Sequence, residues 1–460
     1  MRKHLLTSLL ALLLPLTGIA QTFTHGRSSS YTWPKDELIV KKLDKWQDLK
    51  FGMLIHYGLY SELGIVESWS ICAEEADWIP RDSTIAYDEY KRNYWKTIDR
   101  FKPEKLNPEA WAQYGKKAGM KYVVFTTKHH DGFNMFDTKY SDFSITKGAF
   151  KNHPRRNVAK EVFNAFRNEG YMIGAYFSKP DWHSQYYWWD RYATPNRNVN
   201  YKIDKNPWRW EQFKKFTYNQ IEELMNGDYG AMDILWLDGG WVAPPRQDID
   251  MRKIAAMARS YQPGLLVVDR TVAGEFENYQ TPEQGIPHEQ VNNPWESCIT
   301  LGIDWGWTPH QKYKSSANII HKLTEIVAKG GSLLLGIDPK PDGTLADVVM
   351  ERLTEIGEWT SKNGKAIYET RTTPVYNDGN TWFTQSKDGK IRYAITCLEE
   401  GKPLPEKIIW KGNEPKKGSS IKYIPTGKSV KWQKTANGIE ITLPKNLPAN
   451  QPAVAFEFKP

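Results

Sequence analysis

The sequence predicts an α/β protein built as a (β/α)8-like TIM barrel, followed by a small C-terminal β-sandwich. Six short apolar runs recur along the chain, and amphipathic stretches separate them. Uninterrupted apolar runs are typical of parallel strands covered on both faces, and their alternation with helices over about 300 residues favours a barrel. Beyond Lys365 the chain changes to short β-rich runs separated by turn signals such as Asn377-Asp-Gly-Asn380. This change indicates a second, all-β unit.

The individual elements follow from the spacing of the apolar residues. The predicted barrel strands are 51–56, 122–127, 172–178, 233–238, 265–269 and 331–336. The helices predicted between them include 107–119, 158–170 and 210–225. The strands predicted for the C-terminal part are 391–396, 421–424 and 453–458. We therefore divide the chain into a leader (1–20), a barrel domain (21–365) and a β-sandwich domain (366–460).

The first twenty residues have the pattern of a secretory signal peptide. Arg2 and Lys3 give a basic start, residues 5–16 form an apolar run, and small residues precede Gln21. The apolar run is too short to span a bilayer, and no later segment approaches eighteen consecutive apolar residues. We expect an exported protein, periplasmic or extracellular after cleavage, whose mature chain does not insert into the membrane.

Composition narrows the class of partner. The net charge is +8, but the lysines and arginines are dispersed among acidic residues, which favours solubility over nucleic-acid binding. Three cysteines form neither a CxxC pair nor a disulfide framework. Part of the content of 20 tryptophans and 24 tyrosines is ordinary core, but sugar-binding clefts also need flat apolar rings that stack on pyranoses, so the composition is a hint of such a cleft.

Polar or ionisable residues end each of the first five predicted strands. His56, the segment 128–131, Ser178, Asp238 and Arg270 lie at or just after these ends. In a (β/α)-barrel the carboxyl ends of the strands surround the active site. Core strands have no structural reason to end repeatedly in ionisable groups, so we expect these side chains to meet in one site.

Asp238 has the clearest geometry of the set. Alternation along 233–238 places its side chain on the same face as Trp236, at the mouth of the barrel, and Gly239 and Gly240 follow it. A carboxylate that caps a turn or the next helix would have the same pattern. On the residues alone, the catalytic and the capping interpretations are equally supported.

His129 and His130 are tandem histidines that precede Asp131, a pattern that raises the possibility of a metal-dependent hydrolase. Adjacent residues on an extended segment point to opposite sides, which would make a poor chelate. No HxH or HExxH pattern supports them elsewhere. Hydrogen bonds from the histidines to sugar hydroxyls are the better-supported interpretation, with a structural histidine as the alternative for one of the two.

Four motifs occur in order and carry a resemblance to glycoside hydrolase family 29, the α-L-fucosidases. The likeness runs from about Trp46 to Gly343, and the C-terminal β unit matches that family's layout. It implies a retaining hydrolase that needs no metal and no organic cofactor. The motifs are Phe51-Gly-Met-Leu-Ile-His56-Tyr-Gly, Thr127-Lys-His-His-Asp-Gly-Phe133, Leu235-Trp-Leu-Asp238-Gly and Lys329-Gly-Gly-Ser-Leu-Leu-Leu335.

The resemblance assigns roles to individual residues. Asp238 matches the family's nucleophile, and Glu283 matches the loop glutamate that many members use as acid/base. Glu296 is a rival for the acid/base role, and Glu289 is a more distant one. The residues matching the sugar pocket are His56, Glu67, Trp69, His129, His130, Tyr176, Trp236, Arg270 and Trp305, with Trp78 as a possible substitute for Trp69.

The resulting prediction is a retaining, exo-acting α-L-fucosidase that removes terminal fucosyl residues from an oligosaccharide or glycoconjugate. In retaining enzymes the two carboxyl groups lie about 5–5.5 Å apart, so that one attacks while the other protonates the leaving oxygen. A catalytically impaired fucose-binding protein on the same scaffold is the alternative, and the metal-dependent hydrolase ranks third. The aromatic loop 182–210 is either a platform beyond the fucose or ordinary surface packing.

Overall fold

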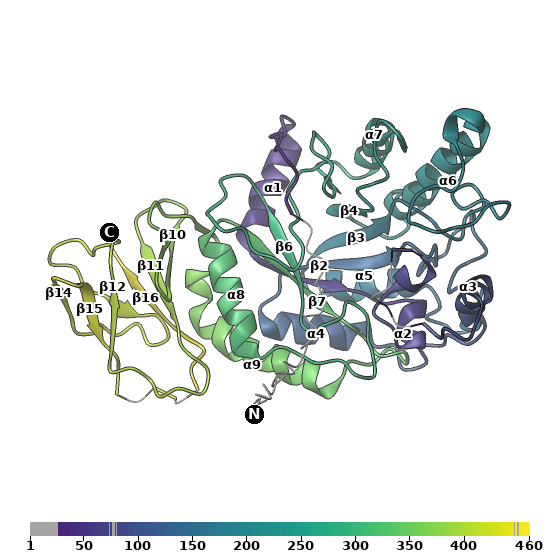
Figure 1. The fold of residues 1–460 in the computed structure, drawn as a ribbon. Coiled ribbons are helices and arrows are strands. Elements are labelled where there is room, and N and C mark those ends of the chain that lie inside the picture. Colours follow the sequence, from purple (N-terminus) through teal and green to yellow (C-terminus); the bar gives the residue numbers. More distant parts are fainter. Residues whose placement is uncertain (1–25, 73, 76–78, 80, 446, 449) are drawn as a thin grey trace, which may run out of the picture.

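The computed structural model describes residues 26–72, 74, 75, 79, 81–445, 447, 448 and 450–460. The predicted leader lies outside these residues. Two units are visible along the chain: a large α/β unit and a smaller β unit, coloured yellow-green, at its side (Figure 1). The architecture predicted from the sequence, a TIM-like barrel followed by a β-sandwich, is confirmed.

A seven-stranded parallel sheet forms the wall of the barrel. The strand order is β5-β4-β3-β2-β1-β7-β6, and every neighbouring pair in it is parallel. Six of these strands are those predicted from the apolar runs, whereas the prediction missed β6. The strands are β1 (Phe51–Ile55), β2 (Tyr122–Lys128), β3 (Met172–Ser178), β4 (Ile234–Asp238), β5 (Leu266–Asp269), β6 (Glu296–Thr300) and β7 (Ser332–Ile337).

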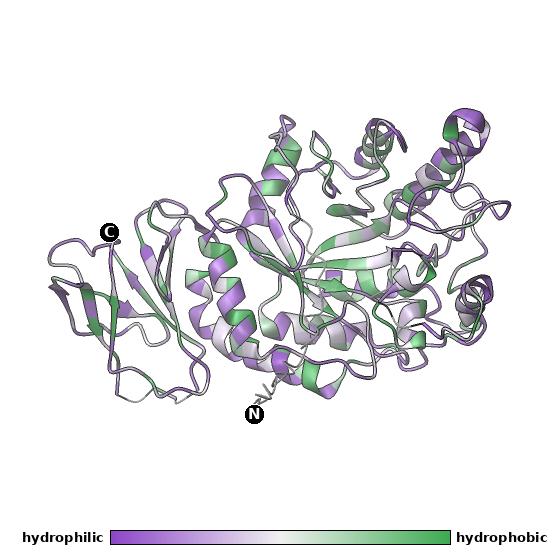
Figure 2. Cartoon of the chain, in the orientation of Figure 1, coloured by the Kyte–Doolittle hydropathy of each residue, from purple (hydrophilic) through white to green (hydrophobic). Residues whose placement is uncertain are grey.

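Amphipathic helices connect the strands and cover the sheet, and Figure 2 shows hydrophobic and hydrophilic faces on α8 and α9. Local signals set their ends. For α4, the Asn107 side chain accepts a hydrogen bond from the Ala110 N–H, Pro108 takes the first turn, and Gly119 ends the helix with φ 92°. The helices are α1 (Glu37–Leu49), α2 (Leu59–Leu63), α3 (Tyr87–Trp95), α4 (Pro108–Ala118), α5 (Val158–Asn168), α6 (Pro207–Met225), α7 (Met251–Tyr261), α8 (Ser316–Ala328) and α9 (Asp347–Asn363).

The ring of strands is open between β5 and β6, and the irregular segment 276–284 fills the opening. Val268 of β5 bridges Glu277, and Cys298 of β6 bridges Glu283. Backbone hydrogen bonds tie the segment to both neighbours, from Asn278 N to Val267 O at 2.9 Å and from Gln284 N to Cys298 O at 2.9 Å. The barrel is therefore closed on this side by isolated bridges instead of a regular strand.

The C-terminal unit consists of two antiparallel sheets around its own core. One sheet has the order β13-β16-β11-β10-β8 with β9 paired to β10, and the other has the order β12-β15-β14. Trp410, Phe383 and Phe456 are buried between them. Helix α8 packs against β10 and so joins the two units. The strands are β8 (Thr370–Arg371), β9 (Asn377–Asp378), β10 (Thr381–Ser386), β11 (Arg392–Cys397), β12 (Lys407–Trp410), β13 (Lys422–Tyr423), β14 (Trp432–Thr435), β15 (Gly438–Thr442) and β16 (Ala453–Phe458).

Two further features concern the state of the cysteines and the presence of membrane-spanning helices. Cys72, Cys298 and Cys397 are buried free thiols. Within the described part of the chain, no helix combines the length and the apolar character needed to cross a bilayer.

Candidate active site

A pocket opens at the carboxyl ends of the barrel strands. Every site residue predicted from the sequence lines it, with the single exception of His129. The lining residues are Leu54, His56, Glu67, Trp69, His130, Tyr176, Trp236, Asp238, Trp241, Arg270, Glu283, Cys298 and Trp305.

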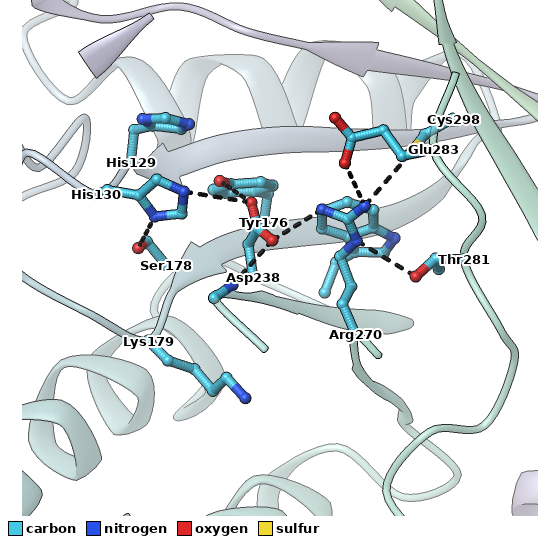
Figure 3. Close-up of polar contacts among 12 residues, drawn as sticks. His129, His130, Tyr176, Ser178, Lys179, Asp238, Arg270, Thr281, Glu283 and Cys298 are labelled. Carbon is cyan, nitrogen blue, oxygen red and sulfur yellow. Dashed lines mark hydrogen bonds and ion pairs between the residues drawn. The ribbon is translucent and has the colours of Figure 1, made fainter. Parts of the chain in front are cut away.

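Asp238 ends β4 and lies at the centre of a hydrogen-bond network (Figure 3). Its Oδ1 accepts hydrogen bonds from Arg270 Nη1 and from the Gly239 N–H, both at 2.8 Å, and its Oδ2 accepts one from the Tyr176 hydroxyl at 2.6 Å. Burial would raise the pKa of Asp238, but Arg270, the Tyr176 hydroxyl and the Gly239 N–H outweigh it and hold the pKa well below its ordinary value. The carboxylate is therefore ionised at any physiological pH.

Arg270, which follows β5, links the two candidate catalytic carboxylates. Its Nη1 contacts Asp238, and its Nη2 donates to Glu283 Oε2 at 2.6 Å. The guanidinium carbon lies 4.5 Å from the centroid of the Trp236 ring, and Nε donates to Thr281 Oγ1 at 3.3 Å. A planar guanidinium held in this way fixes both carboxylates in one pocket.

Glu283 lies on the irregular segment 276–284. Its second oxygen, Oε1, accepts a hydrogen bond from Trp305 Nε1 at 3.2 Å. The bridge to Cys298 of β6 holds its backbone. Glu283 thus lies across the Arg270 guanidinium from Asp238, and both carboxylates line one pocket.

Glu296 occupies a different place. It begins β6, is fully buried, and accepts hydrogen bonds from the Tyr122 hydroxyl at 2.7 Å and from Trp236 Nε1 at 3.1 Å. Burial raises the pKa of Glu296 to about 7. Glu296 is absent from the pocket lining, and Glu289 is exposed. Of the three candidate acid/base residues, only Glu283 lines the pocket.

The expectation that His129 and His130 point to opposite sides is wrong. Their ring centroids lie 4.3 Å apart, because the chain turns directly after β2, where the Gly132 N–H donates to His129 O. His129 contacts Ser68 Oγ through Nδ1 at 2.5 Å and Glu67 Oε2 through Nε2 at 3.1 Å. It therefore orients Glu67 from behind the pocket wall.

His130 lies in the pocket between Ser178 and Asp238. Its Nδ1 lies 2.6 Å from Ser178 Oγ, and the Ser178 hydroxyl also lies 3.0 Å from Pro180 O. Burial lowers the pKa of His130 well below its ordinary value, with a further contribution from His129. Its Nε2 lies 3.7 Å from Asp238 Oδ2 and faces the pocket.

Two groups of histidine and carboxylate side chains lie close enough together to be considered as metal ligands. Ligand atoms of His129, His130 and Asp238 lie within 4.8 Å of one another, as do those of His56, Glu67 and His129. Both ring nitrogens of His129 already contact protein oxygens. A cation bound by either group would have to displace one of these contacts, so the donor set is better suited to hydrogen bonding than to chelation.

The remaining aromatic predictions have mixed outcomes. Trp69 lines the pocket and packs edge-on against His130 with centroids 5.3 Å apart, whereas its rival Trp78 lies outside the described residues. In the loop 182–210, Trp182 and Trp188 are buried and stacked at 5.1 Å. These two rings pack as core and form no exposed platform.

Sequence reasoning missed three lining residues, Leu54, Trp241 and Cys298. Trp241 donates its indole N–H to the Tyr187 hydroxyl at 3.1 Å. It follows Gly239 and Gly240 directly, so its proximity to a strand-end carboxylate was the available signal. Cys298 belongs to β6, and that strand lacks a long apolar run.

Comparison with known proteins places this site in a family. The chain is 29% identical to the plasma α-L-fucosidase of Homo sapiens over 434 residues, covering 90% of this chain and 88% of the relative. It matches α-L-fucosidase isoenzyme 1 of Paenibacillus thiaminolyticus with a TM-score of 0.76 and 26% identity, over 92% and 99% of the two chains. It also matches the Thermotoga maritima α-fucosidase in complex with fucose, with a TM-score of 0.72 and 28% identity, over 93% and 100%. Because the α-L-fucosidase family model matches residues 18–365, this chain belongs to the α-L-fucosidase family of glycoside hydrolases.

Proposed function

We propose that the protein is a retaining, exo-acting α-L-fucosidase in which Asp238 is the nucleophile and Glu283 the acid/base. The observation that carries this assignment is the Arg270 guanidinium, which hydrogen-bonds both carboxylates within one pocket. The Thermotoga maritima relative binds fucose, which supports a fucosylated glycan as the substrate.

In the first step, Asp238 attacks the anomeric carbon of α-L-fucose. A bond forms between that carbon and a carboxylate oxygen, and the bond to the glycosidic oxygen breaks. Protonated Glu283 gives its proton to the departing oxygen. The depressed pKa of Asp238, which Arg270, Tyr176 and the Gly239 N–H maintain against the effect of burial, keeps the nucleophile ionised for this step.

In the second step, Glu283 takes a proton from water, and the water oxygen attacks the anomeric carbon. The ester to Asp238 breaks, and fucose leaves with its original configuration. As the negative charge returns to Asp238, the hydrogen bonds from Arg270, Gly239 and Tyr176 stabilise it. The site is already ordered around the carboxylate, so little reorganisation is needed.

The other pocket residues supply sugar contacts. His56, Glu67 and His130 offer polar atoms for hydrogen bonds with ring hydroxyls. Trp69, Trp236 and Trp305 offer aromatic surface, with Trp305 packing on the methyl group of fucose as the resemblance implies. His129 acts on the sugar through Glu67, whose carboxylate it contacts.

Covalent trapping tests the nucleophile. Incubation with 2-deoxy-2-fluoro-α-L-fucosyl fluoride should leave one fluorofucosyl group on the peptide that contains Asp238, as seen by mass spectrometry. The Asp238→Gly variant should be folded, unlabelled and inactive on 4-nitrophenyl α-L-fucoside. A label on another carboxylate would overturn the assignment. Failure of the wild type to release fucose at all would favour the impaired fucose-binding alternative.

Azide rescue tests the acid/base. Azide should restore turnover of 4-nitrophenyl fucoside by Glu283→Ala and yield α-L-fucosyl azide, because a small anion can occupy the space of the missing carboxylate. The same treatment should not rescue Glu296→Ala. Rescue of the Glu296 variant alone would exchange the two roles. Full activity after dialysis against a chelator would dismiss the metal-dependent alternative.

The proposal extends to export and domain division. Residues 1–20 act as a cleaved signal peptide, residues 21–365 form the catalytic domain, and residues 366–460 form the β-sandwich domain. The basic start and the short apolar run support the first assignment. Sequencing the N-terminus of the exported protein would test it, and a mature chain starting near Gln21 is the expected result.

A further inference from the structure

The segment that carries Glu283 lacks the helix that covers the other barrel connections. Residues 270–295, all of which the structure describes, lead from β5 to β6 without a helix, whereas α5, α6, α7 and α8 each connect two strands of the sheet. The segment 276–284 pairs with its neighbours through isolated bridges and a few backbone hydrogen bonds, without a regular strand ladder. Side-chain contacts, such as those of Asn278 with Val267 and of Gln280 with Asn293, therefore contribute to its position.

Residues 27–31, which we call the N-terminal strap, supply such contacts. Gln280 Nε2 donates to Ser28 O at 3.0 Å and to Ser28 Oγ at 2.7 Å, and the Ser28 hydroxyl also contacts the Glu277 carboxylate. The Tyr31 hydroxyl donates to Asn278 O at 2.7 Å. Glu277, Asn278 and Gln280 are at most 2% exposed. The strap thus satisfies polar groups that the missing helix leaves uncovered.

The opposite side of the same segment faces the reaction centre. Tyr279 packs in the barrel interior, where it stacks on Trp46 of α1 at a centroid distance of 4.0 Å. Thr281 accepts a hydrogen bond from Arg270, and Glu283 follows two residues later. Alternation along 279–283 therefore directs the Gln280 side chain toward the strap and the side chains of Thr281 and Glu283 toward the reaction centre. The segment 277–280, which the strap contacts, ends three residues before Glu283.

We propose that the N-terminal strap is a positioning element for the acid/base: Ser28 and Tyr31 hold the segment 277–280 so that Glu283 stays at the leaving oxygen. The proposal rests on the assignment of Glu283 as acid/base. Ser28 and Tyr31 hydrogen-bond to Glu277, Asn278 and Gln280, none of which lines the pocket. They therefore act on Glu283 through the backbone of the segment. Misplacement of a catalytic group by about 1 Å is enough to cost much of its contribution.

Leaving-group dependence distinguishes a misplaced acid from a general loss of structure. Departure of 4-nitrophenolate needs little protonation, whereas phenolate, a more basic group of nearly the same shape, needs the proton from Glu283. The test uses the full-length exported enzyme as Ser28→Ala/Tyr31→Phe and as Tyr31→Phe alone. The matched control is Ser29→Ala, because Ser29 lies in the strap and is exposed.

The double variant should lose about 10-fold in kcat/KM on phenyl α-L-fucoside and less than about 2-fold in kcat/KM on the 4-nitrophenyl fucoside, within the range that a general acid contributes. Tyr31→Phe should show a smaller effect of the same kind. Ser29→Ala should behave as wild type on both substrates. Thermal melts of each variant identify any that is globally destabilised, and Tyr31→Phe, which keeps its ring, guards against that outcome.

Equal losses on the two substrates, or no loss, would overturn the role of the strap. Glu283→Gln measured in parallel separates this failure from failure of the proposed function. If Glu283→Gln shows the strong leaving-group dependence and the strap variants do not, only the strap proposal falls. If Glu283→Gln itself shows no such dependence, the acid/base assignment is wrong.

Discussion

The Tyr176 hydroxyl donates a 2.6 Å hydrogen bond to Oδ2 of Asp238. Tyr176 lies on β3, and Asp238 ends the neighbouring strand β4. In the register of these two strands, Tyr176 pairs with Trp236 and Ser178 pairs with Asp238. The sheet itself therefore sets the distance between the phenol and the nucleophile. Substitution of Tyr176 isolates one of the hydrogen bonds that order the carboxylate.

Tyr176→Phe should lower kcat/KM about 10- to 100-fold, because a hydrogen bond to a charged group contributes about 1.5–3 kcal/mol. The hydrogen bond favours the ionised form of Asp238, so its removal raises the pKa of that carboxyl. The acidic limb of the kcat/KM profile should therefore move toward neutral pH. A profile with an unchanged acidic limb and undiminished activity would show that the hydrogen bond is not used.

Arg270→Lys should lose at least about 100-fold in kcat/KM although the positive charge remains. A lysine ammonium cannot reproduce the two parallel contacts that the guanidinium makes with Asp238 and Glu283. Arg270→Met should be more severe and should also lower the melting temperature at pH 7, since it leaves two carboxylates without their shared cation. Steady-state kinetics and thermal melts check both expectations. Near wild-type kinetics for Arg270→Lys would mean that charge alone suffices.

Glu296→Gln should keep activity within about 3-fold, in contrast to Glu283→Gln, because Glu296 lies outside the pocket and acts below Trp236. It should also change the pH dependence of stability. Burial raises the folded-state pKa of Glu296 to about 7 from an ordinary 4.5. The stability from this group is fully present below pH 4.5 and is lost as the pH rises through 7.

The Gln variant, which stays neutral, should therefore be more stable than wild type at pH 8, by up to about 3 kcal/mol. At pH 4.5 the two proteins should differ little. Chemical denaturation at the two pH values measures the difference. A constant difference across this range would show that Glu296 does not titrate as its burial implies.

Trp305 should determine the preference for the methyl group of fucose. Trp305→Ala should raise KM for 4-nitrophenyl α-L-fucoside and reduce the preference over the matching α-L-galactoside, which carries a hydroxyl on the same carbon. One methyl-sized contact contributes about 1–3 kcal/mol, or about 10- to 200-fold in kcat/KM. Trp305→Phe keeps a ring and loses only the N–H that contacts Glu283 Oε1. It should keep the preference while lowering kcat.

Most of the site residues that could be predicted from the sequence alone lie at the ends of strands. Asp238, Arg270 and His130 end or follow runs of apolar residues, and parallel strands bring such ends together whatever the loops do. The placement of Trp236 follows from alternation along the strand, whereas Tyr176 was predicted from the family resemblance. These residues lie in the pocket as predicted, and their chemical roles stay predictions for the experiments above.

Loops and non-strand segments were less predictable. The turn after β2 brings the His129 and His130 rings together, and simple alternation cannot anticipate a turn. Strand β6 was missed because Glu296, Ser297 and Thr300 leave it without an apolar run, although the Glu296 carboxyl is buried against Tyr122 and Trp236. Both errors arose where tertiary hydrogen bonds overrode local pattern.

Because of the opening between β5 and β6, the chain around Glu283 can change in length more easily than the chain around Asp238, the other carboxylate proposed as catalytic. Asp238 is built into a hydrogen-bonded strand, where inserting a residue would turn its side chain to the other face. Glu283 is carried on a connection held by isolated bridges, where insertions and deletions leave the ladder of every strand intact. The length of this connection can therefore change without shifting the strand register that holds Asp238.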